Sequence, residues 1–495
     1  MANPKRLDLS LALLSFVMSF WLRASFVATN TFDGLYGQDP FAYYDAAQAL
    51  HSGNLPEAFF WPLGYPGLLM VGFMVFGANA VTGQMINLLM GAVLTPLVYV
   101  LARQIGSGHF GALLAALLMT ICGQAIQSSL VIMADIPALF WVMLSAVALG
   151  IYLDKKHLVW LTLSAVTLAL ACITRWLYLA LIVPWALAYL LKRDFRWRDT
   201  LIAAATLIIF IPQLIYSAHN PAPVLNHAWV EGWSPLNGFK REFTNVDGHF
   251  VYAQENRYFY AQIFYDPFYL APVFTPFMLI GFATLIRRKN YPAAAMLHLW
   301  ALLPYLFLVG IPYQNIRFPL IAFPPIAVLA GVGFEAVARW LWRLQLSNSP
   351  WQIAFRRAFL VVSATAILAF GIRATLSIDL TNINSFIANQ QRDRTAAEYA
   401  TVNIPAGSTV YTFGLTLTLK HYTDFNVYEL YYETPETLNN RWTHGQDDYL
   451  LLNVWNIENQ WAGREPQTAY HWLRDQRGLT QLGRSGYYTL FRIHG

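Results

Sequence analysis

The residues of this sequence best suited to chemistry are two aspartates that stand beside prolines at the ends of apolar stretches. Asp39 directly precedes Pro40, just after the first apolar segment, and Asp135 lies two residues before Pro137. A carboxylate held in such a place can act as a general base that takes a proton from a hydroxyl group. A purely structural role is equally open, because Asp followed closely by Pro is typical of a helix start.

Three arginines are candidate binding groups for an anion, above all a phosphate. Arg317 stands in a short turn before a proline-rich apolar segment, Arg175 opens an earlier segment, and Arg23 lies near the end of the first. A guanidinium matches phosphate with two parallel hydrogen bonds, and ionisable residues in membrane segments are functional candidates by default. The alternative for each arginine is a side chain that reaches back to the membrane surface.

Aromatic residues surround the first aspartate and continue beyond it. Tyr43 belongs to the stretch 37–44, and Tyr65 belongs to a second stretch rich in aromatic residues and proline, 61–67. Both tyrosines are therefore candidate substrate-binding residues. Lys240, in the long loop 219–268, is a further candidate for binding substrate.

The composition shows that these residues belong to a membrane protein. Of the 495 residues, 57% are hydrophobic and only 12% are charged, whereas soluble proteins carry about 25% charged residues. Aromatic residues make up 16%, which suits a chain with two membrane–water interfaces. The net charge of +5 does not indicate nucleic-acid binding, since basic residues fall mostly in short loops between apolar segments. Cys122 and Cys172 both lie in apolar segments, so neither a disulfide framework nor a zinc site is expected.

Apolar segments long enough to cross a bilayer, at about 20 residues each, predict about eleven membrane-spanning helices. They cover residues 8–29, 80–103, 109–128, 136–153, 157–174, 176–191, 200–218, 269–286, 292–310, 318–338 and 358–375. The apolar run 66–77 is too short to cross, since a helix of that length extends only about 18 Å. We expect it to be re-entrant or interfacial.

The distribution of Lys and Arg sets the orientation of these segments. If residues 66–77 do not cross, the loops on one side carry most of the Lys and Arg, and the opposite loops near the spans are poor in them, as the positive-inside rule requires. The loops 30–79 and 219–268 then lie on the outer, non-cytoplasmic side, together with the region after residue 375. Both aspartates and all three arginines are placed at this outer level.

Polar residues return after the last apolar segment, and the pattern changes to that of an α/β domain. Strands are predicted at 409–413, 449–454 and 487–493, and helices at 389–402 and 466–477. We therefore expect a membrane domain over residues 1–375 and an extracytoplasmic α/β domain over residues 376–495.

The order of these features resembles the GT-C superfamily of membrane glycosyltransferases. The shared features are an acid in the first outer loop, aromatic and proline-rich segments after it, an acid in the next outer turn, and the run from Arg317 to Leu320 near the last spans. The resemblance is greatest to the branch that contains bacterial aminoarabinose transferase, protein O-mannosyltransferases and the Rgt-type sugar transferases. A C-terminal outer α/β domain is also shared by many members.

This resemblance implies a GT-C fold and transfer of a sugar from a polyprenyl-phosphate donor to an acceptor hydroxyl, with inversion, at the outer face of the cytoplasmic membrane. Asp39 would match the catalytic base, Asp135 the second acid and Arg317 a phosphate-facing arginine. The implied partners are the lipid-linked donor, a lipid, glycan or protein acceptor, and the bilayer, without nucleic acid. Relatives often carry paired acids where this chain has Gln38 and Asp39. A divalent cation is left open as a cofactor, and no metal ligands are assigned.

Two other functions stay open to the sequence. The same acids and arginines could line the path of a transporter or lipid flippase, or serve a ligase or polymerase that acts on a lipid-linked oligosaccharide. Against transport, the ionisable residues gather at one membrane face, whereas secondary transporters bind near the midplane.

Overall fold

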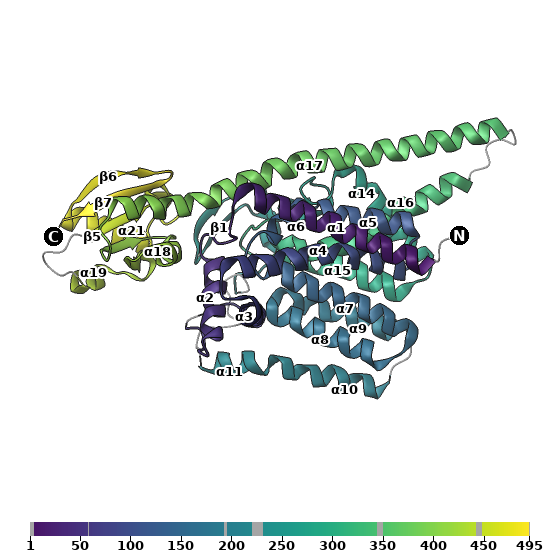
Figure 1. Ribbon diagram of the computed structural model, residues 1–495, viewed down its shortest axis with the longest axis horizontal. Coiled ribbons are helices and arrows are strands. Elements are labelled where there is room, and N and C mark those ends of the chain that lie inside the picture. The colour runs from purple at the N-terminus through teal and green to yellow at the C-terminus, as the bar shows by residue number, and fades with distance from the viewer. Residues whose placement is uncertain are drawn as a thin grey trace.

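The computed structural model describes residues 4–57, 59–192, 196–219, 231–343, 350–441 and 448–494. It consists of a bundle of apolar helices with a smaller α/β unit at one end of the long axis, and the N-terminus lies at the other end (Figure 1). Part of the expected outer loop 219–268, residues 220–230, lies outside the described residues.

Most of the helices lie in the bundle and in the connections at its ends. They are α1 (Pro4–Asn30), α2 (Asp39–His51), α3 (Gly64–Phe76), α4 (Ala80–Gln104), α5 (His109–Ile121), α6 (Gly123–Ser129), α7 (Asp135–Lys155), α8 (Leu158–Thr174), α9 (Ile182–Leu191), α10 (Trp197–Ala205), α11 (Ile211–His219), α13 (Asn256–Ala261), α14 (Thr275–Arg287), α15 (Tyr291–Val309), α16 (Phe323–Arg343) and α17 (Pro350–Asn403). Short 3₁₀ turns join several of them: η1 (Trp176–Leu181), η2 (Thr206–Phe210), η3 (Pro235–Phe239), η4 (Gln262–Phe264), η5 (Pro272–Phe274) and η6 (Phe318–Ala322).

Within the described residues, seven helical segments are long and apolar enough to cross a membrane, or eight if α5 and α6 form one bent span. Three other expected spans correspond to shorter apolar helices, namely α8, η1 with α9, and η5 with α14. The expected total of about eleven therefore stays a prediction. The expected span 109–128 corresponds to α5 and α6, between which the chain bends by 55° at Cys122. The short helix α3 coincides with the run 66–77.

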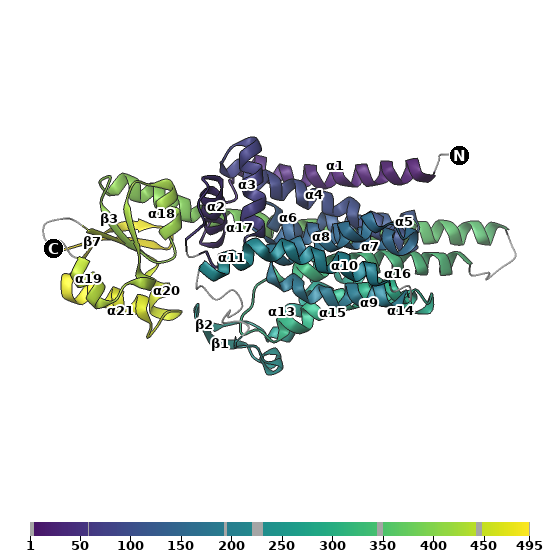
Figure 2. The same ribbon diagram turned by 90° about the horizontal axis from the view of Figure 1, so that it is seen from below.

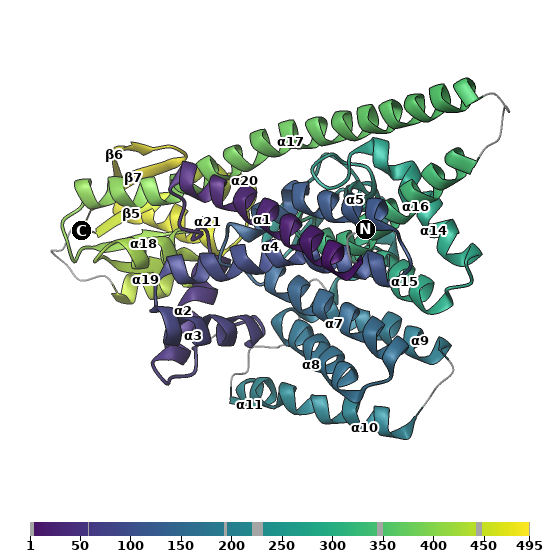
Figure 3. The same cartoon turned by 45° about the vertical axis from the view of Figure 1, so that its right-hand side comes forward.

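The long helix α17 connects the bundle to the α/β unit. It continues for 54 residues along the bundle and into the α/β unit without a break (Figures 1 and 3). The expected helix 389–402 is thus its last part. The boundary expected at residue 376 falls inside this helix rather than in a linker, and the division into two domains stays a proposal.

The α/β unit is built on a five-stranded sheet with the order β4-β3-β5-β7-β6. Its strands are β3 (Thr409–Thr412), β4 (Asn426–Glu429), β5 (Asp448–Leu452), β6 (Leu479–Ser485) and β7 (Tyr488–Ile493). The pairs β4–β3 and β3–β5 are parallel, and β7 pairs antiparallel with β5 and β6. The central strand β5 is buried over its whole length.

Three of these strands, β3, β5 and β7, coincide with the strands expected from the sequence. The strands β4 and β6 were missed because each mixes apolar with polar residues, as strands near a sheet edge do. Short helices connect the strands: α18 (Thr416–Tyr422), α19 (Pro435–Arg441), α20 (Val454–Asn459) and α21 (Glu465–Trp472), the last continued by the turn η8 (Leu473–Arg477). The expected helix 466–477 corresponds to α21 and η8.

Polar contacts attach the α/β unit to the first outer loop. The hydroxyl of Tyr422 donates to Asp33 Oδ2 at 2.7 Å, and Arg394 Nη1 lies 3.7 Å from the same oxygen. Gln391 Nε2 donates to the backbone oxygen of Asn30 at 2.8 Å. These contacts place the unit directly over the end of the bundle that carries α2 and α3 (Figure 2).

A second attachment comes from the hairpin of β1 (Glu242–Asn245) and β2 (Gly248–Val251), which lies in the long outer loop. Gln460 Nε2 donates to the backbone oxygen of Asp247 at 2.7 Å, and the Gln460 backbone oxygen accepts from His249 N at 2.9 Å. The α/β unit is therefore held from two sides.

Helices α14 and α16 approach each other so closely that only glycine fits at two points. A Cβ atom at Gly333 would overlap the carbonyl oxygen of Phe277, and one at Gly281 would overlap that of Leu329. Small residues at such points let helix backbones meet, which is a common means of helix association in membranes.

We expect Gly333→Ala to lower the stability of the bundle by about 1–3 kcal/mol, because the added methyl group forces α14 and α16 apart. Gly67→Ala is the matched control, since a Cβ there meets open space. It should leave stability unchanged or raise it slightly, because alanine is the better helix former. Thermal unfolding of the detergent-purified chain measures both. Equal midpoints for the two variants would contradict the close contact.

Candidate active site

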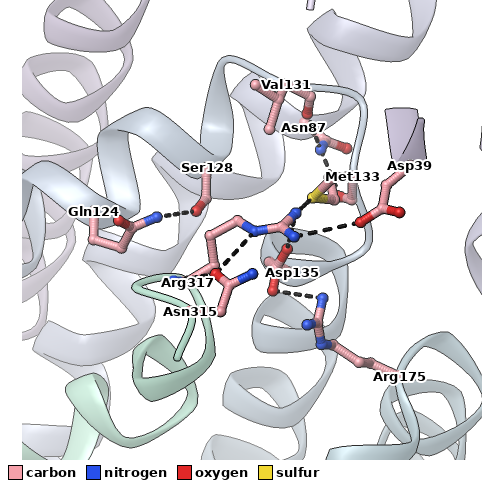
Figure 4. A network of polar contacts seen from close by, with 10 residues as sticks. All are labelled: Asp39, Asn87, Gln124, Ser128, Val131, Met133, Asp135, Arg175, Asn315 and Arg317. Atoms are coloured by element: carbon pink, nitrogen blue, oxygen red, sulfur yellow. Dashed lines mark hydrogen bonds and ion pairs between the residues drawn. The ribbon is translucent and has the colours of Figure 1, made fainter. Parts of the chain in front are cut away.

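Four charged residues meet at the end of the bundle that faces the α/β unit (Figure 4). Arg317 Nη2 lies 3.3 Å from Asp39 Oδ2, and Arg317 Nη1 lies 3.9 Å from Asp135 Oδ2. Arg175 Nη1 lies 2.6 Å from Asp135 Oδ1. The order Asp39, Arg317, Asp135, Arg175 alternates in sign. Each carboxylate therefore has a guanidinium beside it, and the group is neutral overall.

Each of the four residues comes from a different segment of the chain. Asp39 is the first residue of α2 and Asp135 the first of α7, where the helix dipole favours negative charge. Arg175 is the extended residue between α8 and η1, and Arg317 directly precedes η6. The sequence placed these four residues at one membrane level. The structure brings them into contact.

The two aspartates are not the N-caps of their helices. The capping positions are held by Gln38 before α2 and Ala134 before α7. Each aspartate therefore lies one residue after the capping position, and the expected capping role is wrong. This shift turns both carboxylates toward the arginines.

The turn before Asp135 is fixed by an amide inside α4. Asn87 Nδ2 donates to the backbone oxygens of Val131, at 2.5 Å, and Met133, at 2.8 Å (Figure 4). Asn87 Oδ1 in turn accepts from the hydroxyl of Tyr65 at 2.8 Å. Tyr65 thus orients Asn87, and Asn87 in turn holds the turn before Asp135. The sequence analysis missed Asn87, although a buried amide within an apolar span signals such a role.

A second amide of α4 ties this turn to the first outer loop. Gln84 Nε2 donates to the backbone oxygens of Phe32, at 2.9 Å, and Leu130, at 2.8 Å. In addition, Ile132 N donates to the backbone oxygen of Gly34 at 3.0 Å. The loop before Asp39 and the turn before Asp135 therefore form one bonded unit.

The turn that carries Arg317 is held by the long outer loop. Tyr260 Oη donates to the backbone oxygen of Tyr313 at 2.8 Å, and Asn256 Nδ2 donates to that of Ile311 at 2.5 Å. Asn315 Oδ1 accepts from Arg317 N at 3.0 Å and from Arg317 Nε at 3.3 Å. These bonds leave Nη2 directed at Asp39, while Nη1 contacts the sulfur of Met133 and lies beside Asp135.

The site is open at one end and closed at the other. The Asp39 side chain is 34% exposed, that of Arg317 16% and that of Asp135 only 6%. Among the described residues, no hydrogen-bond donor reaches the buried Asp135 Oδ2. Burial by itself would lower the pKa of Arg317, but Tyr36, Asp135 and Asp39 together raise it above its usual value. The guanidinium therefore stays charged.

Tyr43 lies beside this group, one helical turn after Asp39. Its ring meets that of Tyr65 edge to face at 5.2 Å and stacks on Trp61 at 6.4 Å. Burial raises the pKa of Tyr43, and the charges of Arg175, Asp39, Asp135 and Arg317 shift it further in both directions. The phenol therefore stays neutral and within reach of all four charges.

Arg23 and Lys240 are not brought to the site. Arg23 is fully buried, with Nε donating to Ser129 Oγ at 3.1 Å and Nη1 donating to Ser19 Oγ at 2.6 Å. Lys240 is exposed beside a separate hollow of about 540 Å³ near β1. In the described part of the chain, no hydrogen bond or ion pair joins either residue to Asp39 or Asp135. Their expected membership of the same binding site is therefore not seen.

A divalent cation does not fit between the two aspartates. The Arg317 guanidinium already lies between their carboxylates, and Arg175 pairs with the second oxygen of Asp135. Across the ranges that the structure describes, no three His, Cys, Asp or Glu side chains are grouped so as to hold a metal ion. We therefore assign no metal to these carboxylates.

A family model of dolichyl-phosphate-mannose-protein mannosyltransferases matches residues 10–224, which include Asp39, Asp135 and Arg175. The structure is similar to that of ArnT from Cupriavidus metallidurans bound to undecaprenyl phosphate, with a TM-score of 0.62 and 14% identity over 98% of this chain and 97% of that one. The likeness shows that the chain has the GT-C fold.

A second GT-C structure shows the same likeness. The oligosaccharyltransferase of Archaeoglobus fulgidus in its apo form aligns with a TM-score of 0.61 and 14% identity, over 92% of this chain and 70% of that one. No curated protein matches this chain in sequence. The likeness therefore establishes the architecture, and the chemistry has to be argued from the site itself.

We expect Asp135→Asn to destabilise the protein by about 3–5 kcal/mol, because it leaves two largely buried guanidinium groups without their shared carboxylate. Asp154→Asn, at the exposed far end of the same helix, is the matched control and should change stability little. Thermal unfolding in detergent compares the two variants. A midpoint for Asp135→Asn equal to that of the control would show that the ion pairs contribute little to the fold.

Proposed function

We propose that this chain transfers a sugar from a polyprenyl-phosphate donor to an acceptor hydroxyl, with inversion at the anomeric carbon. The observation that carries the proposal is the contact between Asp39 and Arg317, at 3.3 Å. It sets a proton acceptor beside a cation suited to phosphate. The fold supports a lipid-linked donor, since ArnT has been solved with undecaprenyl phosphate and AglB, the oligosaccharyltransferase of Archaeoglobus fulgidus, with a dolichol-phosphate.

In this proposal Arg317 binds the donor phosphate. The guanidinium is now shared between two carboxylates, and a phosphate offers it stronger, bidentate hydrogen bonds. As Arg317 turns to the phosphate, Asp39 Oδ2 is released toward the open end of the site. Arg175 keeps Asp135 in place through their 2.6 Å contact, and the unbonded Asp135 Oδ2 is available to a sugar hydroxyl.

The transfer itself is a single displacement. The acceptor oxygen attacks the anomeric carbon from the side opposite the phosphate, so a new carbon–oxygen bond forms as the bond to the phosphate oxygen breaks. The proton of the acceptor hydroxyl passes to the Asp39 carboxylate. The negative charge that develops on the leaving polyprenyl phosphate is stabilised by Arg317. Atoms and charge balance without a metal or any other co-reactant.

We further propose that the site and the α/β unit face the outer side of the cytoplasmic membrane. The direction of α7 supports this orientation: the helix has 21 residues, begins at Asp135 in the site and ends at Lys155. That length extends roughly 30 Å, about the thickness of the hydrocarbon core. Basic residues also end α4 and α14, at Arg103 and Arg287.

We expect Asp39→Asn to reduce sugar transfer by about 10²- to 10⁴-fold, the usual contribution of a general base. Folding should be kept, because the residue is partly exposed and the substitution preserves its shape. The measurement is consumption of endogenous polyprenyl-phosphate sugar in membranes that contain the chain, followed by mass spectrometry of extracted lipid. Asp154→Asn serves as the control. Near-normal consumption by Asp39→Asn would remove this residue from the role of base, and labelled sugar crossing proteoliposomes without a covalent product would indicate a transporter.

We expect Arg317→Ala to weaken binding of undecaprenyl phosphate by about tenfold to hundredfold, as the loss of a charged hydrogen-bond partner does. Arg317→Lys should lose less, since it keeps the charge without the planar fork. Binding to the detergent-purified chain is measured directly, with Arg287→Ala at the opposite end of the bundle as the control. Equal affinities for Arg317→Ala and wild type would show that the phosphate binds elsewhere.

A further inference from the structure

A cleft of about 840 Å³ lies between the first outer loop and the α/β unit. One wall is formed by α2 and residues 56–61, and the other by residues 413–433 and Trp461. Its volume falls within the range of about 300–1,000 Å³ that is usual for small-molecule sites. The cleft reaches Gln38, the neighbour of Asp39, so it adjoins the open end of the charged site.

The face of α2 that lines the cleft carries three small side chains beside the carboxylate of Asp45. Ala42, Ala46 and Ala49 follow one another at helical spacing on one face. Asp39 precedes Ala42 by three residues and therefore lies on the same stripe of the helix. A ligand that packs on these alanines therefore extends along α2 toward Asp39, the proposed base.

The polar groups of the cleft are mainly acceptors. Asp45, Glu57, Asp247 and Glu429 line it, against the single cation Lys420. A fifth acid of the lining, Glu433, is paired with Arg441. Ionised carboxylates accept hydrogen bonds and donate none, so they match hydroxyl and ammonium groups and repel phosphate or carboxylate groups.

Aromatic side chains complete the far wall. Trp461 packs edge to face on Phe413, with ring centroids 4.8 Å apart, and on Tyr431 at 5.8 Å. Tyr432 stands at the rim and is 77% exposed. Such rings offer a flat apolar face next to a polar edge, which suits a ligand whose own faces are apolar and whose edges carry hydroxyl groups.

These features favour a carbohydrate over an extended peptide. One common mode of binding an extended peptide adds it as a strand to a sheet edge. The edge strand at the cleft, β4, has only four residues and so offers few ladder hydrogen bonds. Sugar rings need no such ladder, because aromatic side chains can pack on their faces while carboxylates accept hydrogen bonds from their hydroxyl groups.

We infer that this cleft binds the acceptor, and that the acceptor is a carbohydrate chain that is uncharged or carries amino groups. The inference rests on the proposed sugar transfer and adds the chemical class of the second substrate. An acceptor hydroxyl at the end of such a chain would reach Asp39 along α2, while the donor phosphate occupies Arg317. The two substrates then approach from different sides of the same carboxylate.

The test is binding of fluorescently labelled oligosaccharides to the detergent-purified full chain. The probes are a glucose oligomer, a glucosamine oligomer and a sulfated glucose oligomer of equal length, with a serine-rich peptide as the fourth. We expect the first two to bind, the glucosamine oligomer more tightly, and the sulfated oligomer and the peptide not to bind. The inference is overturned if neither of the first two binds at up to about 10 mM, weaker than ordinary ligand affinities. Equal binding of the sulfated oligomer, or preferential binding of the peptide, also overturns it.

Variants with matched controls locate the binding. Tyr431→Ala combined with Tyr432→Ala should weaken oligosaccharide binding at least about fivefold, whereas Trp455→Ala, a 72% exposed aromatic of the same unit outside the cleft lining, should not. Asp45→Asn should remove most of the preference for the glucosamine oligomer, whereas Asp424→Asn, exposed and outside the lining, should preserve it. Equal effects of the cleft variants and their controls would place the carbohydrate elsewhere.

The two proposals fail separately. Each cleft variant should bind undecaprenyl phosphate as wild type does, and Asp39→Asn should still bind the glucosamine oligomer. If Asp39→Asn keeps its donor consumption, the sugar-transfer proposal fails whatever the cleft binds. If Asp39→Asn loses donor consumption while the cleft variants retain full oligosaccharide affinity, only the assignment of the acceptor fails.

Discussion

The structure depends on the sharing of one guanidinium, that of Arg317, between two carboxylates. A single buried charge would be expensive in this largely apolar surrounding. Alternation of Asp39, Arg317, Asp135 and Arg175 removes that cost only if all four side chains arrive together. The first outer loop, the turn before α7, the end of α8 and the turn before η6 are therefore each bound by hydrogen bonds to their neighbours.

This arrangement is neutral before any substrate arrives, which shapes what it can bind. A phosphate adds negative charge, so its binding must change the pairing of the arginines rather than fill an empty positive site. The gradient of exposure from Asp39 to Asp135 indicates where that change is easiest. The open end can exchange partners with a ligand, while the closed pair of Asp135 and Arg175 maintains the geometry. Preorganised charge of this kind is the usual source of electrostatic catalysis.

The α/β unit contributes through its position. The unbroken helix α17 and the contacts of Tyr422 and Gln460 hold it over α2, so one wall of the cleft belongs to each part of the molecule. A ligand between them meets the carboxylates and rings of one part and the alanine stripe of the other. The cleft adjoins the charged site at Gln38. The proposed donor and acceptor therefore bind to separate surfaces that share one carboxylate.

The sequence by itself indicated the membrane class, predicted an orientation, and singled out Asp39, Asp135, Arg175 and Arg317 as candidates. Hydropathy and the positions of basic residues fix the depth of each residue along the membrane normal, and those four share one depth. Depth says nothing about lateral neighbours, so only the tertiary structure showed that Arg23 bonds to Ser129 of α6 and to Ser19 of its own helix. For the same reason the sequence did not predict the contacts of Asn87 or the cleft. Both join segments that are far apart in the chain, and such contacts leave no periodic pattern in the sequence.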